Sequence, residues 1–156
     1  MINLRKITEE NFTDAFHLKL APGQERFVSH PVRSLAQAYV YREQCQPFGI
    51  YEDDTMVGYV MVIYDYDIPE YDIWHMMIDE SHQGRRYGSA ALDRVLAYIR
   101  TKPFGSSDRV ALTCHKENAL ALHLYKSKGF EETGAVYEDE TELSLTITDT
   151  RAAAES

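Results

Sequence analysis

The spacing of apolar residues in the first part of the chain predicts a strand followed by a short helix. Residues 2–8, INLRKIT, alternate apolar and polar side chains, as expected for a strand with one buried face. Thr8 has a hydroxyl suited to capping a helix, and a short helix is predicted to extend through about residues 17–20. Pro22 and Gly23 then predict a break in the helix.

A second helix is predicted over residues 35–44. Ser34 and Gln37 have the S-x-x-Q spacing of a capping box, in which each side chain bonds to a backbone amide of the first turn. Pro47 favours extended backbone at the residue before it, so we expect the helix to end ahead of it.

Three strands are predicted next. Residues 47–52 and 55–64 are apolar-rich runs on either side of the acidic turn Asp53-Asp54, which indicates a hairpin. Residues 71–79 are nearly apolar throughout, and such a run is typical of a strand in the centre of a sheet.

The second half of the chain predicts two helices and three strands. Apolar residues recur at helical spacing after residues 82–89, and Pro103 and Gly105 predict the end of that helix. Asn118 is the predicted cap of the other helix, which ends near Gly129. The apolar positions of the first helix are Leu92, Val95, Leu96 and Ile99. The three strands are predicted at residues 109–115, 130–136 and 142–148.

The resulting order, β-α-α-β-β-β-α-β-α-β-β, is that of one mixed α/β domain. A chain of 156 residues suits a single domain. We predict that the domain spans residues 1–148 and that residues 149–156 form a frayed tail.

Composition and charge exclude several classes of protein. The formal net charge of −9 argues against a nucleic-acid partner, because binding a phosphate backbone needs a basic face. It permits a cationic substrate, although many proteins are acidic for solubility alone. No apolar run approaches the length of a membrane span, and MINLRKITEE lacks the apolar core of a signal peptide. Cys45 and Cys114 match no zinc motif, so we predict no metal and a reduced, cytoplasmic protein.

The stretch HQGRRYGS at residues 82–89 has the features of a phosphate-binding loop. It follows the apolar run WHMMI and precedes a predicted helix, whose first backbone N–H groups and dipole favour an anion. Gly84 and Gly88 leave room for an anion, and Arg85 and Arg86 supply positive charge. The spacing matches neither a P-loop nor a dinucleotide fingerprint. A strand-to-helix turn without a ligand remains the alternative.

A second motif lies on the next predicted helix. Asn118, Ala121 and Tyr125 fall about one turn apart, and Gly129-Phe130 follow, in the pattern N-x-x-A-x-x-x-Y-x-x-x-G-F. Together with QGRRYG, which is similar to the pyrophosphate loop Q-x-x-G-x-G/A, this helix resembles the GNAT superfamily of acetyl-CoA-dependent N-acetyltransferases. The resemblance covers residues 2–147.

A narrower resemblance points to the bacterial spermine/spermidine acetyltransferase branch of that superfamily. It is carried by QERFVSHPVRSLAQAYVY, PFGIYEDDTMVGYVMV and IWHMMIDESHQGRRYG. Two positions depart from the family pattern. His75 stands where many relatives have arginine, and Arg86 stands where the family has its first loop glycine. Amide donation by the loop is preserved if Arg86 keeps a helical φ below zero.

The resemblance implies a fold, a reaction and a set of site residues. The fold is a mixed central sheet with helices on both faces. The reaction moves an acetyl group from the cosubstrate acetyl-CoA to a primary amine, with Tyr125 as the acid that protonates the leaving thiolate. The implied cofactor-binding residues are Met76, Met77, Ile78, Gln83, Gly84, Arg85, Arg86, Tyr87, Gly88, Ser89, Asn118 and Tyr125.

The resemblance also implies a polyamine as the amine acceptor and a possible homodimer. The open alternatives are an aminoglycoside, an amino acid, a protein N-terminus or a lysine as the acceptor, and a non-catalytic module that binds acyl-CoA.

The proton acceptor for the attacking amine is left open by the sequence. Glu70, Asp72, His75 and Glu142 lie on or beside strands expected near the cleft. His75 has the most suitable ordinary pKa, yet a histidine on a central strand is often a structural residue of the core. Each carboxylate is more commonly a solvated or structural group than a base.

Overall fold

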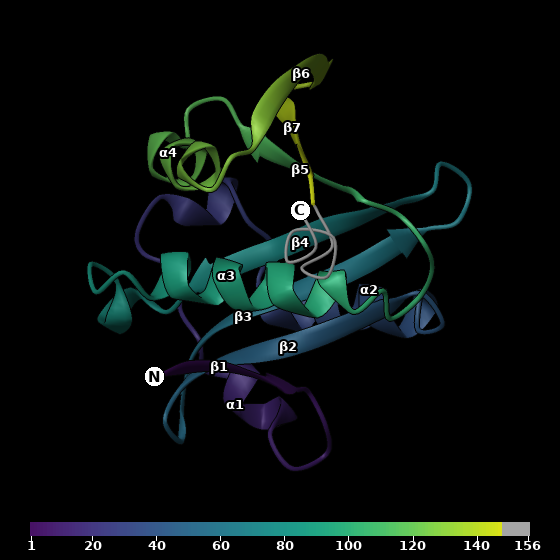
Figure 1. Ribbon diagram of the computed structural model, residues 1–156. Coiled ribbons are helices and arrows are strands. Elements are labelled where there is room, and N and C mark those ends of the chain that lie inside the picture. The colour runs from purple at the N-terminus through teal and green to yellow at the C-terminus, as the bar shows by residue number, and fades with distance from the viewer. Residues whose placement is uncertain (148–156) are drawn as a thin grey trace.

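The computed structural model describes residues 1–147, which form one seven-stranded mixed sheet flanked by helices (Figure 1). The strands lie in the order β1-β2-β3-β4-β5-β7-β6. Their bounds are β1 (Ile2–Lys6), β2 (Cys45–Glu52), β3 (Thr55–Asp65), β4 (Glu70–Ile78), β5 (Arg109–His115), β6 (Glu131–Tyr137) and β7 (Glu140–Thr146). The helices are α1 (Phe12–Phe16), α2 (Pro31–Val40), α3 (Tyr87–Arg100) and α4 (Ala119–Ser127), with short 3₁₀ helices η1 (Gln24–Arg26) and η2 (Glu80–His82).

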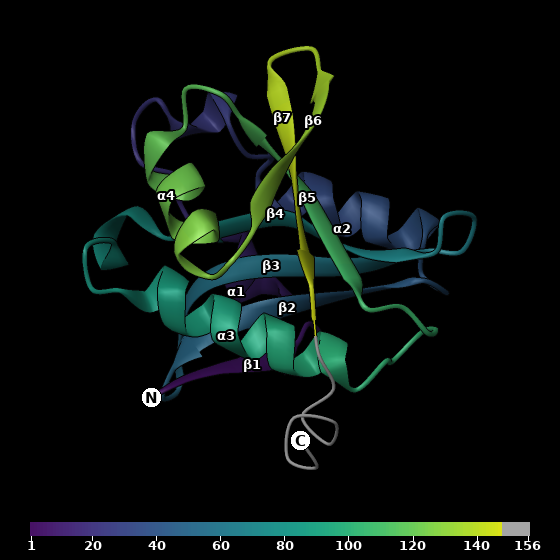
Figure 2. The ribbon, with the colours of Figure 1, turned by 45° about the horizontal axis from the view of Figure 1, so that its top comes forward.

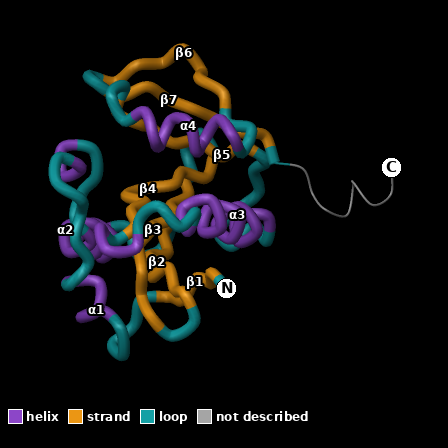
Figure 3. The backbone as a smooth tube through the Cα atoms, turned by 90° about the vertical axis from the view of Figure 1, so that its left-hand side faces the viewer, coloured by secondary structure: helices purple, strands orange, loops and turns teal. Residues whose placement is uncertain are grey.

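The fold class and the order of elements agree with the sequence prediction. The hairpin of β2 and β3, the central position of β4, and the helices α3 and α4 are all as expected. Helices cover both faces of the sheet, with α1 and α2 on one side and α3 on the other (Figure 3). Thr148, the predicted end of the last strand, and the predicted tail 149–156 lie outside the described residues.

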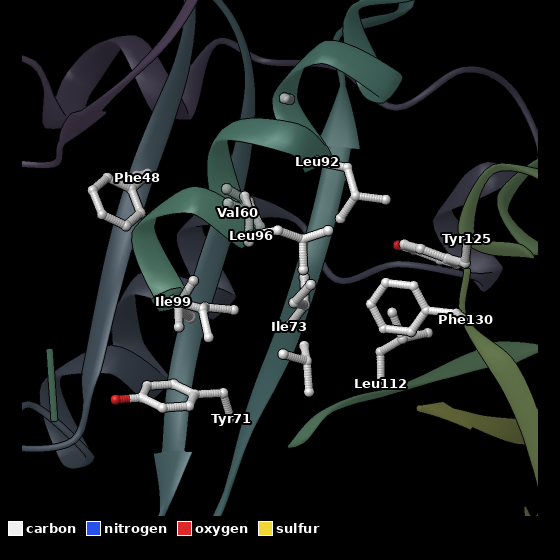
Figure 4. Packing of buried hydrophobic residues seen from close by; sticks show 14 of the residues in the cluster. Phe48, Val60, Tyr71, Ile73, Leu92, Leu96, Ile99, Leu112, Tyr125 and Phe130 are labelled. Carbon is white, nitrogen blue, oxygen red and sulfur yellow. The ribbon is translucent and has the colours of Figure 1, made fainter. Parts of the chain in front are cut away.

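The two faces of the sheet bury separate apolar clusters, because side chains alternate along β3. Tyr59, Met61 and Ile63 pack with Ala15 of α1 and Ala38 of α2. On the other face, the four apolar positions predicted for α3 are buried with β3, β4 and β5. Figure 4 shows this second cluster, where Tyr125 and Phe130 lie side by side with ring centroids 5.8 Å apart.

The predicted starts of the first two helices are wrong. Asn11, not Thr8, occupies the N-cap position of α1, and the Thr8 hydroxyl accepts a hydrogen bond from the Glu10 amide instead. Helix α2 begins at Pro31, after the ring of His30 accepts a hydrogen bond from the Val32 amide. Proline in the first turn has its φ already set for a helix, so α2 starts about one turn earlier than predicted.

The capping-box interpretation of Ser34 and Gln37 is therefore also wrong. Both residues lie within α2, three positions apart and on the side that faces the sheet. Ser34 is completely buried, and its hydroxyl contacts β3 and β4 rather than a backbone amide of its own helix.

Strands β4 and β5 separate soon after they begin. They pair in parallel only at Tyr71 with Val110 and at Asp72 with Ala111. Beyond these pairs β5 and β7 run across the direction of β3 and β4 (Figure 2). The later part of β4 consequently has strand β3 on one side and no paired strand on the other. This opening in the sheet positions the candidate site.

Candidate active site

A cavity of about 650 Å³ lies at the opening, between the end of β4, the loop at residues 82–89 and helix α4. Eleven of the twelve residues expected to bind the cofactor line this cavity; the exception is Arg85, which is exposed to solvent. The eleven are Met76, Met77, Ile78, Gln83, Gly84, Arg86, Tyr87, Gly88, Ser89, Asn118 and Tyr125. The fold thus brings together two motifs that are about thirty positions apart in the sequence.

The loop adopts left-handed backbone at two positions. Gly84 has φ 80° and Arg86 has φ 63° and ψ 20°. Arg86 therefore lacks the negative φ that was the condition for a helical backbone here, and a non-glycine residue takes the conformation that glycine adopts without cost. No side chain caps α3, so among the described residues the amides of its first turn are left open toward the cavity.

Two loop residues also have a structural role. The side-chain Nε2 atom of Gln83 donates to the Ile78 carbonyl at 2.9 Å, which ties the loop to the end of β4. The same atom donates to Gln24 Oε1 at 2.9 Å, which ties the loop to η1. Gly88 lies in the first turn of α3, where a Cβ atom would be 3.5 Å from Leu124 Cδ2. That spacing is an ordinary contact, so alanine would fit and a larger side chain would crowd α4.

Helix α4 contributes Asn118 and Tyr125. Asn118 is the N-cap, as predicted, and its Oδ1 accepts a hydrogen bond from the Ala121 amide. Tyr125 is only 9% exposed, and burial raises the pKa of its phenol well above the ordinary range. Its hydroxyl forms no hydrogen bond with another described residue. It is therefore a protonated donor at neutral pH, free to bind a ligand.

A second cavity, of about 590 Å³, adjoins the first. Met76, Asn118, Ala121 and Tyr125 line both, so the two cavities meet beside the Tyr125 side chain. The four residues considered as proton acceptors, Glu70, Asp72, His75 and Glu142, all line this second cavity.

The wall formed by β4 and β7 is acidic. Arg109 Nε donates to Glu70 at 2.7 Å, and Arg109 Nη2 donates to Glu142 at 3.2 Å. Asp72 forms no ion pair within residues 1–147. Burial, and next the charge of Glu70, raise the pKa of Asp72 from 3.8 to about 8. Glu70 and Glu142 therefore share one guanidinium group, and Asp72 lies beside them as a third carboxyl group, which makes this wall attractive to a cation.

His75 differs from the other three residues. It has φ 58° at a register shift between β3 and β4, and its Nδ1 atom lies 2.7 Å from the buried Ser34 hydroxyl. Burial, and next the charge of Arg33, lower the pKa of His75 to about 4, so the ring is neutral near pH 7. Sequence reasoning missed the partnership with Ser34, because it assigned that serine to a helix cap.

Other residues have the structural roles expected from the sequence. Cys45 and Cys114 are free and buried, and burial raises the pKa of Cys114 to about 11. A thiol with such a pKa is a poor nucleophile at neutral pH.

Within the described part of the chain, no three histidine, cysteine or acidic side chains are grouped to hold a metal ion. No helix in that part is long and apolar enough to cross a membrane.

The chain thus combines a mixed sheet that opens between two parallel strands with a glycine-containing loop at the mouth of the next helix. The sequence model of the acetyltransferase (GNAT) family matches residues 5–130. The chain therefore belongs to this family of acetyltransferases.

Solved structures with the same fold have low sequence identity to the chain. A spermidine N-acetyltransferase from Vibrio cholerae, in complex with CoA and spermine, is 19% identical with a TM-score of 0.76, over 95% of this chain and 96% of that one. A ribosomal-protein-S18-alanine N-acetyltransferase from Escherichia coli is 18% identical with a TM-score of 0.71, over 95% of each chain. The PaiA N-acetyltransferase from Thermoplasma acidophilum, in complex with coenzyme A, is 12% identical with a TM-score of 0.71, over 94% of this chain and 99% of that one.

The chain is also similar in sequence to part of a longer protein. An uncharacterised protein of Mycobacterium leprae is 31% identical over 104 residues, which are 65% of this chain. The matched region is 26% of that relative, so the chain spans about a quarter of its length.

Proposed function

We propose that the chain acetylates a primary amine of a polyamine such as spermidine or spermine. The observation that carries this proposal is the acidic wall of the second cavity, where Glu70 and Glu142 share the guanidinium group of Arg109 and Asp72 adds a third carboxyl group. A polyamine carries several ammonium groups, so one can bind this wall while another nitrogen reaches Tyr125. The net charge of −9 acts in the same direction by attracting cations.

The first cavity is the proposed site of acetyl-CoA, which supplies an activated acetyl group as a thioester. The open amides of Tyr87, Gly88 and Ser89 would bind the diphosphate, and Arg86 would add charge-assisted hydrogen bonds. The unpaired edge of β4 at Met76, Met77 and Ile78 would bind the pantetheine arm as a neighbouring strand does. An amide near Met77 would polarise the thioester carbonyl. Gln83, Gly84 and Asn118 would complete the site.

Tyr125 is the proposed general acid, because it lies where the two cavities meet and its phenol is protonated. It would donate its proton to the leaving thiolate. The attacking amine must be neutral, and an alkyl amine with an ordinary pKa of about 10.4 is neutral in only about one molecule in a thousand at neutral pH. Asp72 is the carboxyl group whose pKa best suits removal of that proton, either directly or through water.

The test is thiol release from acetyl-CoA with a panel of acceptors: spermidine, spermine, an aminoglycoside, single amino acids and a peptide that begins with alanine. The proposal expects the highest kcat/KM for a polyamine. A higher value for the peptide or the aminoglycoside would overturn the polyamine assignment. Binding of acetyl-CoA without thiol release for any amine would indicate the non-catalytic alternative.

A charge variant makes the same test specific to the acidic wall. Glu142→Gln removes the charge of one of the three carboxyl groups and should raise KM for spermidine by several-fold, because a partly exposed ion pair is worth about 1 kcal/mol or less. Glu131→Gln is a matched control, since Glu131 is exposed on β6 and lines neither cavity. Equal KM values for the two variants would contradict binding of a cation at this wall.

A further inference from the structure

A short chain of buried hydroxyl groups leads from β3 through α2 to the second cavity. Tyr59 Oη lies 2.8 Å from Ser34 Oγ, and Ser34 Oγ lies 2.7 Å from His75 Nδ1. Tyr59 and Ser34 are completely buried, whereas His75 is half-buried and lines the cavity. The positions of the protons on these three side chains determine whether His75 is a hydrogen-bond donor or an acceptor toward the cavity.

The phenol fixes the direction of the chain. Within the described residues, Ser34 Oγ is the one hydrogen-bond partner of Tyr59 Oη, so the Tyr59 proton has no other acceptor. If His75 Nδ1 donated to Ser34 and Ser34 donated to Tyr59, the Tyr59 proton would be buried without a partner. An unsatisfied buried donor disfavours that arrangement by about 5- to 150-fold in population. Tyr59 is therefore the donor to Ser34.

The Ser34 hydroxyl then needs an acceptor for its own proton. One candidate acceptor is His75 Nδ1 at 2.7 Å, and the other is Met61 Sδ at 3.9 Å. A thioether sulfur is a weak acceptor, and a separation of 2.7 Å is typical of a hydroxyl donor but short for an imidazole N–H donor. Ser34 therefore donates to His75 Nδ1.

We infer that Tyr59 and Ser34 hold His75 as the neutral tautomer with its proton on Nε2, so that His75 presents a hydrogen-bond donor to the acceptor cavity and does not accept the proton of the attacking amine. The inference rests on the proposed function only in naming the second cavity as the acceptor site. Burial, and next the charge of Arg33, lower the pKa of His75, so the ring is neutral and one of its two nitrogen atoms is free to accept a hydrogen bond.

The position of Nε2 supports a role toward the ligand. This atom forms no hydrogen bond within residues 1–147, and it is not among the buried polar atoms that lack a partner. It is therefore accessible from the cavity that His75 lines. Gln37 Oε1, one turn along α2 from Ser34, is a buried atom without a partner and belongs to a residue of the same wall.

The two walls of the cavity consequently bind different groups. The α2-facing wall offers an N–H donor from His75, which can bind an oxygen atom or an ordered water but not an ammonium group. The carboxyl wall of Glu70, Asp72 and Glu142 binds the ammonium group. His75 is thus a positioning residue that directs the cationic part of the acceptor toward the carboxyl wall, where the proton acceptor also lies.

The direct test is imidazole ¹⁵N spectroscopy of the labelled free protein between pH 5 and 8. The inference expects a His75 ring with protonated Nε2 and unprotonated Nδ1 throughout this range. Ser34→Ala should remove the lock, giving a mixture of tautomers and a higher pKa, because a hydrogen bond to the neutral form is lost. Tyr64→Phe is the control, because it also removes a buried hydroxyl group. Tyr64 lies on the same strand as Tyr59 but faces the other cluster, so this variant should leave the His75 signals unchanged. A proton on Nδ1 in the wild-type protein would overturn the inference.

Kinetics supply a second readout. His75→Gln keeps an N–H donor and should retain kcat within about 10-fold, with the same pH profile as the wild type, whereas loss of a general base costs about 10²- to 10⁴-fold. A loss of that size, together with disappearance of an ionisation between pH 6 and 7.5, would overturn the inference. The spectra need no substrate, so failure of the polyamine assignment in the acceptor panel would leave the tautomer result intact and distinguishable.

Discussion

The conformation of Arg86 allows a quantitative prediction that separates folding from cofactor binding. Arg86 is the residue before α3 and has φ 63° and ψ 20°, a left-handed conformation in which an L-residue other than glycine is strained. Its exposed side chain lines the proposed cofactor cavity, whereas its neighbour Arg85 does not. Arg86→Gly should relieve the strain, and it removes one positive charge from the cavity.

The size of the effect follows from two opposing terms. Left-handed backbone costs an L-residue roughly 1–2 kcal/mol, and glycine avoids that cost. Glycine also loses more backbone entropy on folding, which offsets about 0.5–1 kcal/mol. Arg86→Gly should therefore raise the free energy of unfolding by about 0.5–1 kcal/mol. For a domain of this size, the corresponding rise in Tm is about 1–4 °C.

The assay is urea unfolding and thermal unfolding of three variants. Arg86→Ala removes the same charge but keeps the strain, so it should be less stable than Arg86→Gly by about 1 kcal/mol. Arg85→Gly lacks a strained position to relieve and should be slightly less stable than the wild type. An Arg86→Gly protein less stable than the Arg86→Ala protein would refute the assignment of strain to this residue.

Calorimetry on the same proteins tests the second half of the prediction. If Arg86 contacts the diphosphate of CoA, both Arg86 variants should bind CoA about 10-fold or more weakly, because a charge-assisted hydrogen bond contributes about 1.5–3 kcal/mol. Arg85→Gly should bind nearly as well as the wild type. The same loss at both arginines would instead indicate a general effect of charge.

Three further predictions concern the site. Tyr125→Phe should lower kcat by about 10²- to 10⁴-fold with little change in the Kd of CoA; a rate close to that of the wild type would remove Tyr125 from the reaction. Gly88→Val should weaken CoA binding at least 10-fold in calorimetry by crowding Leu124, whereas Gly88→Ala should fold normally, and wild-type affinity in Gly88→Val would contradict the phosphate cradle. The pKa of Asp72 is raised to about 8 by folding, so the folded protein binds more protons than the unfolded chain between about pH 4 and pH 8, and stability falls as pH rises through that window. Asp72→Asn should remove this loss of stability, which amounts to at most about 1.4 kcal/mol per pH unit. The variant should therefore unfold at a higher urea concentration than the wild type at pH 9. Equal pH dependence of stability in the two proteins would contradict the raised pKa.

The sequence predicts most of the fold because its strongest patterns are local. Strand β4 is rich in apolar residues, α3 repeats apolar residues at helical spacing, and Asn118 caps α4, so each element is specified by its own residues. The starts of α1 and α2 are less well specified. Asn11 occupies the N-cap position of α1 without a side-chain hydrogen bond to the helix, and α2 is capped by the ring of His30, a less usual cap than the serine four positions further on.

The site divides in the same way. Most of the cofactor cavity could be predicted, because eleven of its residues belong to segments that the resemblance identifies. The left-handed backbone of Arg86, the absence of Arg85 from the lining and the contribution of residues 20–28 were not predicted. The acceptor cavity could be predicted only in part. Its carboxyl groups come from β4 and β7, and its neutral wall comes from α2 and the register shift at His75, so tertiary packing alone brings them together. No local pattern relates Ser34 to His75, which are 41 positions apart.

The most direct test of the account is to follow the backbone amides by NMR while CoA, and separately pantetheine, is added. CoA carries the diphosphate and pantetheine lacks it. The account predicts that CoA shifts the amides of Tyr87, Gly88 and Ser89 together with those at the end of β4, and that pantetheine shifts only the latter. Saturable binding of CoA that leaves the amides of residues 84–89 unmoved would contradict it.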